Sequence, residues 1–87
     1  MIEYKVEMFQ HGKWVVARKP FGGMCYGVRK KEYALYFIEN CKKDWQYVVN
    51  DKIKYLKAMP TDYRIMSREI TDWKEVYNTN VGKKEEG

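Results

Sequence analysis

The sequence has little of the chemistry that most enzymes and metalloproteins use. Its 87 residues include one histidine, His11, and two cysteines, Cys25 and Cys41. A catalytic triad needs a histidine beside a carboxylate and a nucleophile, and a zinc site needs closely spaced ligand pairs. Here His11 stands next to Gly12 in an expected turn, the cysteines form no CxxC pair, and no phosphate-loop pattern occurs. We therefore expect a protein that is not an enzyme, with no catalytic residue, no metal ligand and no cofactor.

Long hydrophobic runs are also absent. No stretch approaches the roughly 18 apolar residues of a transmembrane helix. The N-terminus alternates apolar and charged residues, whereas a signal peptide has a basic start followed by an apolar block. We expect no membrane segment, a cytoplasmic location, and reduced cysteines that pack in the core.

The composition that remains suits one small globular domain. Hydrophobic residues make up 45% of the chain and aromatic residues 16%, so a core is feasible without disulfide or metal staples. We assign residues 1–77 to a single α+β domain. The polar residues 78–87 are expected to form a flexible tail.

The first third of the chain carries strand patterns. Residues 2–9 alternate strictly, and the apolar side chains of one face are those of Ile2, Tyr4, Val6 and Met8. Gly12 permits the positive φ of a tight hairpin turn. Residues 13–18 then form the returning strand, and residues 24–28 form a short third strand that contains Gly27.

From Lys30 onward, apolar residues recur with helical spacing. They are Ala34, Phe37, Ile38, Cys41, Trp45, Val48 and Val49. This stripe predicts a helix over about residues 31–46 with a break near Asn50, although residues 47–49 also read as the start of a strand. A second short helix over 52–59 would turn Ile53 and Leu56 toward the core, with Met59 as a further candidate for that face.

The remaining pattern completes the fold. Residues 63–70 predict another strand, and residues 71–75 either open a short helix or continue that strand with Trp73 facing inward. The fold class is therefore α+β, with one main helix packed on one face of an antiparallel sheet. The sheet has three to four strands, at about 2–9, 13–18, 24–28 and 63–70. Its other face is left for solvent or a partner.

Positive charge is concentrated before the helix. The formal net charge is +5, and residues 18–31 carry five basic side chains and no acidic one. Such a stretch attracts anions, phosphates above all. The candidate residues for nucleic-acid or anion binding are Arg18, Lys19, Arg29, Lys30 and Lys31, with Trp14 and Tyr26 as stacking rings. The alternative interpretation is a solvated surface that only keeps the protein in solution.

Two segments carry a recognisable pattern. A GKW strand at residues 12–14 precedes a KKEYA helix start at residues 30–34, and residues 63–73 read YRIMSREITDW. Together they resemble small accessory proteins encoded by phages and prophages of Gram-positive bacteria. That resemblance implies a binder that modulates a host enzyme, a host defence system or a phage complex, and it implies no site residues.

The first segment is also distantly similar to the three-strand-plus-helix DNA-binding domains of the AP2/integrase type. Those domains read DNA with Arg and Trp on the outer face of the sheet. By this resemblance Trp14, Arg18 and Arg29 would take such positions. Those domains end at their helix, whereas this chain continues.

Three functions follow from these features. The first is a non-enzymatic module that docks on a host or phage protein through aromatic anchors, for which the candidates are Tyr33, Tyr36, Tyr55 and Trp73. The second is direct nucleic-acid binding by the basic stretch. The third is an oligomeric binder of a small anionic nucleotide, whose phosphate would meet the backbone amides of Gly22 and Gly23.

Overall fold

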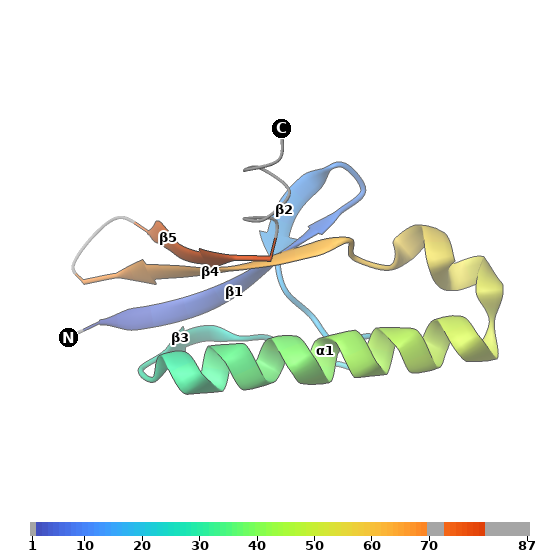
Figure 1. Ribbon diagram of the computed structural model, residues 1–87, viewed down its shortest axis with the longest axis horizontal. Coiled ribbons are helices and arrows are strands. Elements are labelled where there is room, and N and C mark those ends of the chain that lie inside the picture. The colour runs from blue at the N-terminus through green and yellow to red at the C-terminus, as the bar shows by residue number, and fades with distance from the viewer. Residues whose placement is uncertain (1, 70–72, 80–87) are drawn as a thin grey trace.

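The computed structural model describes residues 2–69 and 73–79 and contains one antiparallel sheet with one long helix beneath it (Figure 1). The sheet order is β2-β1-β4-β5, and β3 also pairs with β1. The elements are β1 (Glu3–Gln10), β2 (Lys13–Val16), β3 (Tyr26–Val28), α1 (Lys31–Asp51), the 3₁₀ helix η1 (Ile53–Ala58), β4 (Asp62–Arg68) and β5 (Lys74–Asn78). The predicted α+β class, with its antiparallel sheet and one main helix, is confirmed.

Strand β1 is the centre of the sheet. Its alternation places Val6 and Met8 in the core, and β4 pairs along it from Glu3 to Phe9. On its other edge, β2 pairs with Glu7–Gln10 and β3 with Tyr4 and Lys5. The hairpin turn between β1 and β2 has positive φ at both His11 (54°) and Gly12 (80°), as a two-residue type I′ turn requires.

Helix α1 buries the predicted stripe against the sheet. Ala34, Ile38, Cys41, Trp45 and Val49 are its buried residues. The first four of these pack with Val6, Met8, Tyr63 and Ile65 of the strands. The helix ends at Asp51 rather than near 46, because Val49 extends the buried stripe by one more turn and this outweighs the strand propensity of residues 47–49.

The segment after α1 differs from the expectation. Residues 53–58 form the 3₁₀ helix η1, in which no residue is buried. Ile53 and Leu56 are 72% and 53% exposed, so the prediction that they face the core is wrong. Met59, the further candidate, does pack against the core, together with Ala58. The Thr61 N–H donates to the Phe9 carbonyl, which fixes the entry to β4.

The sheet has one strand more than the sequence indicated. Strand β5 pairs with β4, and the Thr79 hydroxyl accepts a hydrogen bond from the Tyr63 N–H at 2.9 Å. Asn78, which the sequence placed in the tail, is buried at the end of β5. Residues 70–72, for which the sequence left a short helix and a continued strand open, and the tail from residue 80 lie outside the described residues. Within the described ranges, no helix is apolar and long enough to cross a membrane.

Candidate functional site

Cations and aromatic rings interleave on the sheet face opposite α1, here called the outer sheet face. The rings of Tyr26 and Trp73 meet edge to face, with centroids 5.4 Å apart. The Lys5 ammonium lies 4.7 Å and the Arg68 guanidinium 4.5 Å from the centre of the Trp73 ring. Trp73 is only partly exposed and two cations of the same chain lie over it, so little of its ring is left for a partner.

A second cluster occupies the same face around Trp14. The Arg64 guanidinium lies 4.3 Å from the centre of the Trp14 ring, and Phe9 packs edge to face against that ring. Arg64 also pairs with the Glu7 carboxylate at 2.6 Å and approaches Glu75 at 3.6 Å. The guanidinium is thus held by a ring and two carboxylates together.

The outer sheet face is balanced in charge among the residues just described. Its cations are Lys5, Arg64 and Arg68, and each pairs with a carboxylate from the set Glu3, Glu7 and Glu75. Single-stranded nucleic acids bind to free ring faces flanked by unpaired cations. Here the cations are paired with carboxylates and lie over the rings, so this face is a poor match for a nucleic-acid strand.

Glu7 links this network to the stability of the protein at acid pH, so the pH dependence of unfolding tests the network. Burial raises its pKa, but the hydrogen bonds and charges of Arg64 and Lys5 outweigh burial, so the pKa of Glu7 is lowered from its usual value. Unfolded Glu7 takes up a proton at higher pH than folded Glu7. Stability from this group is therefore present above about pH 4.5 and is lost as pH falls through the folded pKa.

We expect Glu7→Gln to remove part of the acid dependence of the free energy of unfolding. Urea denaturation between about pH 3 and 7 measures it. Glu39→Gln, which removes an exposed carboxylate of α1, is the control for loss of one negative charge. An acid slope as steep in Glu7→Gln as in the wild type would contradict the network.

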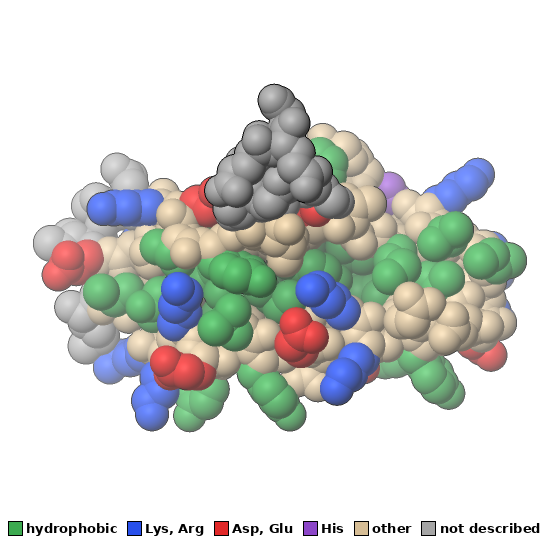
Figure 2. Space-filling model, viewed as in Figure 1, with side chains coloured by type: hydrophobic (Ala, Val, Ile, Leu, Met, Phe, Trp, Pro, Cys, Tyr) green, Lys and Arg blue, Asp and Glu red, His purple; other side chains and the backbone are tan. Residues whose placement is uncertain are grey.

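A different surface gathers exposed apolar rings. It runs over the loop 19–24, the adjoining flank of α1, and η1, and we call it the aromatic surface. Its members are Phe21, Met24, Tyr33, Tyr36, Tyr47 and Tyr55, each at least 40% exposed. Figure 2 shows hydrophobic side chains projecting from the α1 edge of the molecule. Within this surface, Tyr36, Tyr47 and Phe21 are 70%, 68% and 67% exposed.

The loop 19–24 holds its place by backbone bonds and by the helix. The Lys19 N–H donates to the Gly23 carbonyl and the Gly22 N–H to the Lys19 carbonyl, with φ above 100° at both glycines. The Arg18 carbonyl accepts hydrogen bonds from Trp45 Nε1 (3.3 Å) and Cys41 Sγ (3.4 Å). The loop is thus fastened to α1. Because the Gly22 amide is used inside the turn, it is not directed at a phosphate.

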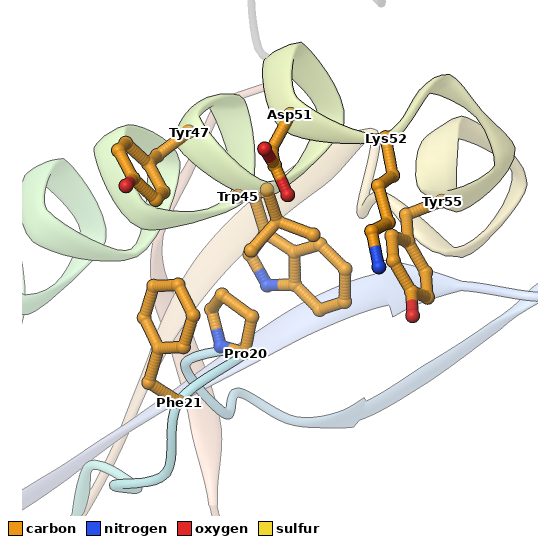
Figure 3. Close-up of a pocket in the computed structure, with 8 residues that line it drawn as sticks. Pro20, Phe21, Trp45, Tyr47, Asp51, Lys52 and Tyr55 are labelled. Atoms are coloured by element: carbon orange, nitrogen blue, oxygen red, sulfur yellow. The ribbon is translucent and has the colours of Figure 1, made fainter.

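Two hollows lie on either side of this loop. The larger, of about 390 Å³, is the Trp45 pocket, lined by Pro20, Phe21, Trp45, Tyr47, Val48, Asp51, Lys52 and Tyr55 (Figure 3). The smaller, of about 240 Å³, is lined by Lys19, Met24, Cys25, Val28, Tyr33, Tyr36, Phe37 and Asn40. The aromatic surface is therefore uneven and offers sockets for side chains as well as projecting rings.

The basic residues predicted to bind nucleic acid do not lie beside the rings predicted to stack on its bases. Trp14 and Tyr26 belong to the outer sheet face, where the cations around them are Arg64, Lys5 and Arg68. Arg18 and Arg29 are exposed outside the named strands, which differs from the AP2/integrase-type placement on a sheet face.

The lysines of the basic stretch lie close to the helix. Lys19 lies over the Phe37 ring, 5.3 Å from its centre, and Lys30 over the Tyr33 ring at 5.8 Å. Lys31 is the first residue of α1 and is partly buried. The structure thus divides the basic stretch between the loop and the start of the helix.

Of the four predicted partner-binding aromatics, Tyr33 and Tyr36 line the smaller hollow and Tyr55 lines the Trp45 pocket. Tyr33, Tyr36 and Tyr55 belong to the aromatic surface, whereas Trp73 lies on the outer sheet face. Phe21 and Tyr47 were not among the predicted anchors, although their rings meet edge to face at 6.2 Å. A signal for Tyr47 was present, because Tyr33, Tyr36 and Tyr47 share one helix flank once the helix is continued beyond residue 46.

Nucleophile and metal chemistry have little support in the described ranges. His11 is exposed in its hairpin turn, and both cysteines are free and buried. Burial raises the pKa of both thiols, which disfavours the reactive thiolate. Among residues 2–69 and 73–79, no three histidine, cysteine or acidic side chains are grouped as metal ligands.

Comparisons with known proteins give no relative for this arrangement. The chain matches no family model, no curated protein and no solved structure.

Proposed function

We propose that this chain is a non-enzymatic binding module that docks on a protein partner through the aromatic surface. The observation that carries the proposal is the group of exposed side chains over the loop 19–24, α1 and η1. Large exposed apolar patches on small domains mark interaction sites, and tyrosine is favoured at binding hot spots. The two hollows beside the loop are depressions into which side chains of a partner can insert.

The charges on this surface are of both signs. Lys19, Lys30, Lys52 and Lys54 lie beside its rings and hollows, and two carboxylates lie among them. Asp44 and Asp51 lie on the same flank of α1 as Tyr47, and Asp51 lines the Trp45 pocket. Neither carboxylate forms an ion pair with a residue in the described part of the chain. Charges of both signs suit a protein partner, which can supply matching groups of both signs, whereas these carboxylates repel the uniformly negative backbone of a nucleic acid.

The class of partner follows from the resemblance to phage accessory proteins. We propose a role in the cytoplasm as a phage-type modulator that binds a host or phage protein. Direct nucleic-acid binding and binding of an anionic nucleotide are the competing functions, and the experiment below separates them.

Loss of partner capture by aromatic variants tests the proposal. The immobilised full chain is exposed to a lysate of the cells in which it is made, and captured proteins are identified and then confirmed with purified partner. We expect Phe21→Ala with Tyr36→Ala to weaken capture at least about tenfold, because each truncated anchor costs about 1 kcal/mol or more. Both side chains are exposed, so the fold should persist.

Matched controls separate the competing functions. Tyr77→Ala removes a ring from β5, away from the aromatic surface, and should leave capture unchanged. Arg18→Glu with Arg29→Glu should also leave it nearly unchanged. If this charge reversal abolishes a salt-dependent binding of labelled DNA or RNA, while the aromatic variants keep that binding, the protein is a nucleic-acid binder instead. A rise in melting temperature with added nucleotides would point to the third function.

A further inference from the structure

The Trp45 pocket combines aromatic walls with an acidic group. In Figure 3, Trp45 lies at the back of the pocket, Phe21 and Tyr47 at one side and Tyr55 at the other. The Asp51 carboxylate extends from the end of α1 toward the Trp45 ring. Four rings and one carboxylate thus surround a hollow of about 390 Å³, which is large enough for the end of one side chain.

The Trp45 ring is fixed and shows the pocket only its apolar surface. Its Nε1–H donates to the Arg18 carbonyl at 3.3 Å, and the residue is 9% exposed. The indole N–H is therefore not available to a ligand, as it would be in a groove that reads backbone carbonyls of proline-rich peptides. What remains is the negative face of a π system, which attracts cations.

Asp51 supplies the complementary charge. Its carboxylate has no ion-pair partner among the described residues, and Asp44 lies two helical turns before it on the same flank of α1. The neighbouring ring of Tyr55 already has an ammonium group of this chain, that of Lys54, 5.3 Å from its centre. Rings of this surface therefore accept cations.

Among the residues that the structure describes, Lys52 is the one positively charged side chain that lines the pocket. It is exposed and follows α1 directly, with its backbone N–H bonded to the Val48 carbonyl. The flexible stem of lysine lets its ammonium leave the pocket for water at little cost. Lys52 would oppose a cationic ligand and assist an anionic one, so it discriminates between the two.

We propose that the Trp45 pocket binds the cationic end of a partner's side chain, an arginine guanidinium or a lysine ammonium, methylated or not. This rests on the proposed function, because it names the anchor that the partner inserts into the aromatic surface. The rings surround the cation, and Asp51 pairs with its charge. Aromatic cages of this composition select organic cations over neutral groups of equal shape.

Proton–nitrogen NMR of the full chain tests the pocket with small probes. The three tryptophans give three indole N–H signals, of which only that of Trp45 reports on the pocket; those of Trp14 and Trp73 report on the outer sheet face. The probes are the N-acetyl amides of arginine, lysine and trimethyllysine. The N-acetyl amide of citrulline, which is neutral and nearly isosteric with arginine, is the control. We expect at least one cationic probe to shift the Trp45 signal saturably, with Kd of about 1–10 mM.

Two neighbouring substitutions give opposite expected effects. Asp51→Asn should weaken binding of the cationic probe at least about threefold, and Lys52→Gln should strengthen it. Tyr36→Ala, outside the pocket, should leave probe binding unchanged although it weakens partner capture. Equal binding of citrulline, no saturable shift with any cationic probe, or weaker binding in Lys52→Gln would overturn the cation site.

The two proposals can fail separately. If the aromatic variants lose the partner but no cationic probe moves the Trp45 signal, docking stands and the cation pocket is wrong. If the probes bind as expected but Phe21→Ala with Tyr36→Ala captures the partner as well as the wild type does, the cation pocket is supported and docking through the aromatic surface is wrong.

Discussion

Replacement of Ile38 by alanine is expected to lower the free energy of unfolding by about 2–5 kcal/mol, out of roughly 4–13 kcal/mol for a domain of this size. Ile38 is 2% exposed and sits in the centre of the buried stripe of α1. Alanine is the better helix former, so the loss reflects core packing and not helix propensity. Urea denaturation followed by circular dichroism measures it.

Ile53→Ala is the matched control, with the same chemical change in a helical segment of the same chain. Because Ile53 is 72% exposed, we expect a loss within about 0.5 kcal/mol. Similar losses at both positions would mean that η1 packs onto the domain in solution, as the sequence pattern had indicated. The pair therefore tests the point on which sequence and structure differ most.

The sequence predicted those elements whose pattern has only one reading. The alternation of β1 and the stripe of α1 both repeat over several turns or residue pairs. Val6, Met8 and most of the stripe are buried as expected, whereas Ile2, before the strand, is 47% exposed. The stop of α1 could not be located, because residues 47–49 combine β-branched and aromatic side chains that suit either element. Only the burial of Val49 against the rest of the domain resolves that choice.

Strand β5 was not predicted, and the apolar side chains of η1 were wrongly predicted to be buried, for a related reason. Both are short, and the burial of a short element depends on its neighbours. In β5 four of the five residues are exposed and Asn78 alone is buried, so no alternation marks the strand. In η1, apolar residues spaced like a core face are directed to solvent. Hydrophobic spacing shows that a face exists, but not what covers it.

The candidate site was predicted in part, for reasons of topology. Tyr33 and Tyr36 share a helix flank, so their proximity follows from helical geometry alone. Their association with Phe21 and Met24 depends on the loop 19–24 folding back on α1, through hydrogen bonds between Trp45, Cys41 and the Arg18 carbonyl. No local pattern contains that contact. Likewise, Trp73 lies beside Lys5 only because β4 returns along β1.

Native Cys41 is expected to react with a thiol reagent at least about a thousandfold more slowly than in the unfolded chain. Its side chain is fully buried, and its Sγ–H donates to the Arg18 carbonyl. Burial also raises the pKa of the thiol, so the thiolate is scarce even when reagent is present. Stopped-flow absorbance with an aromatic disulfide reagent, with and without urea, measures both rates.

Cys25 should be the faster of the two thiols. It is 3% exposed and lies just after the loop 19–24, where it lines the smaller hollow, so opening of that loop alone can uncover it. The single-thiol variants Cys25→Ala and Cys41→Ala assign each rate. Protection at Cys41 should follow global stability and decline in parallel with it in urea, whereas protection at Cys25 should respond less to urea because a smaller surface opens.

Rapid reaction of native Cys41 would contradict its burial between α1 and the sheet. It would also support a nucleophilic thiol, and with it an enzymatic function.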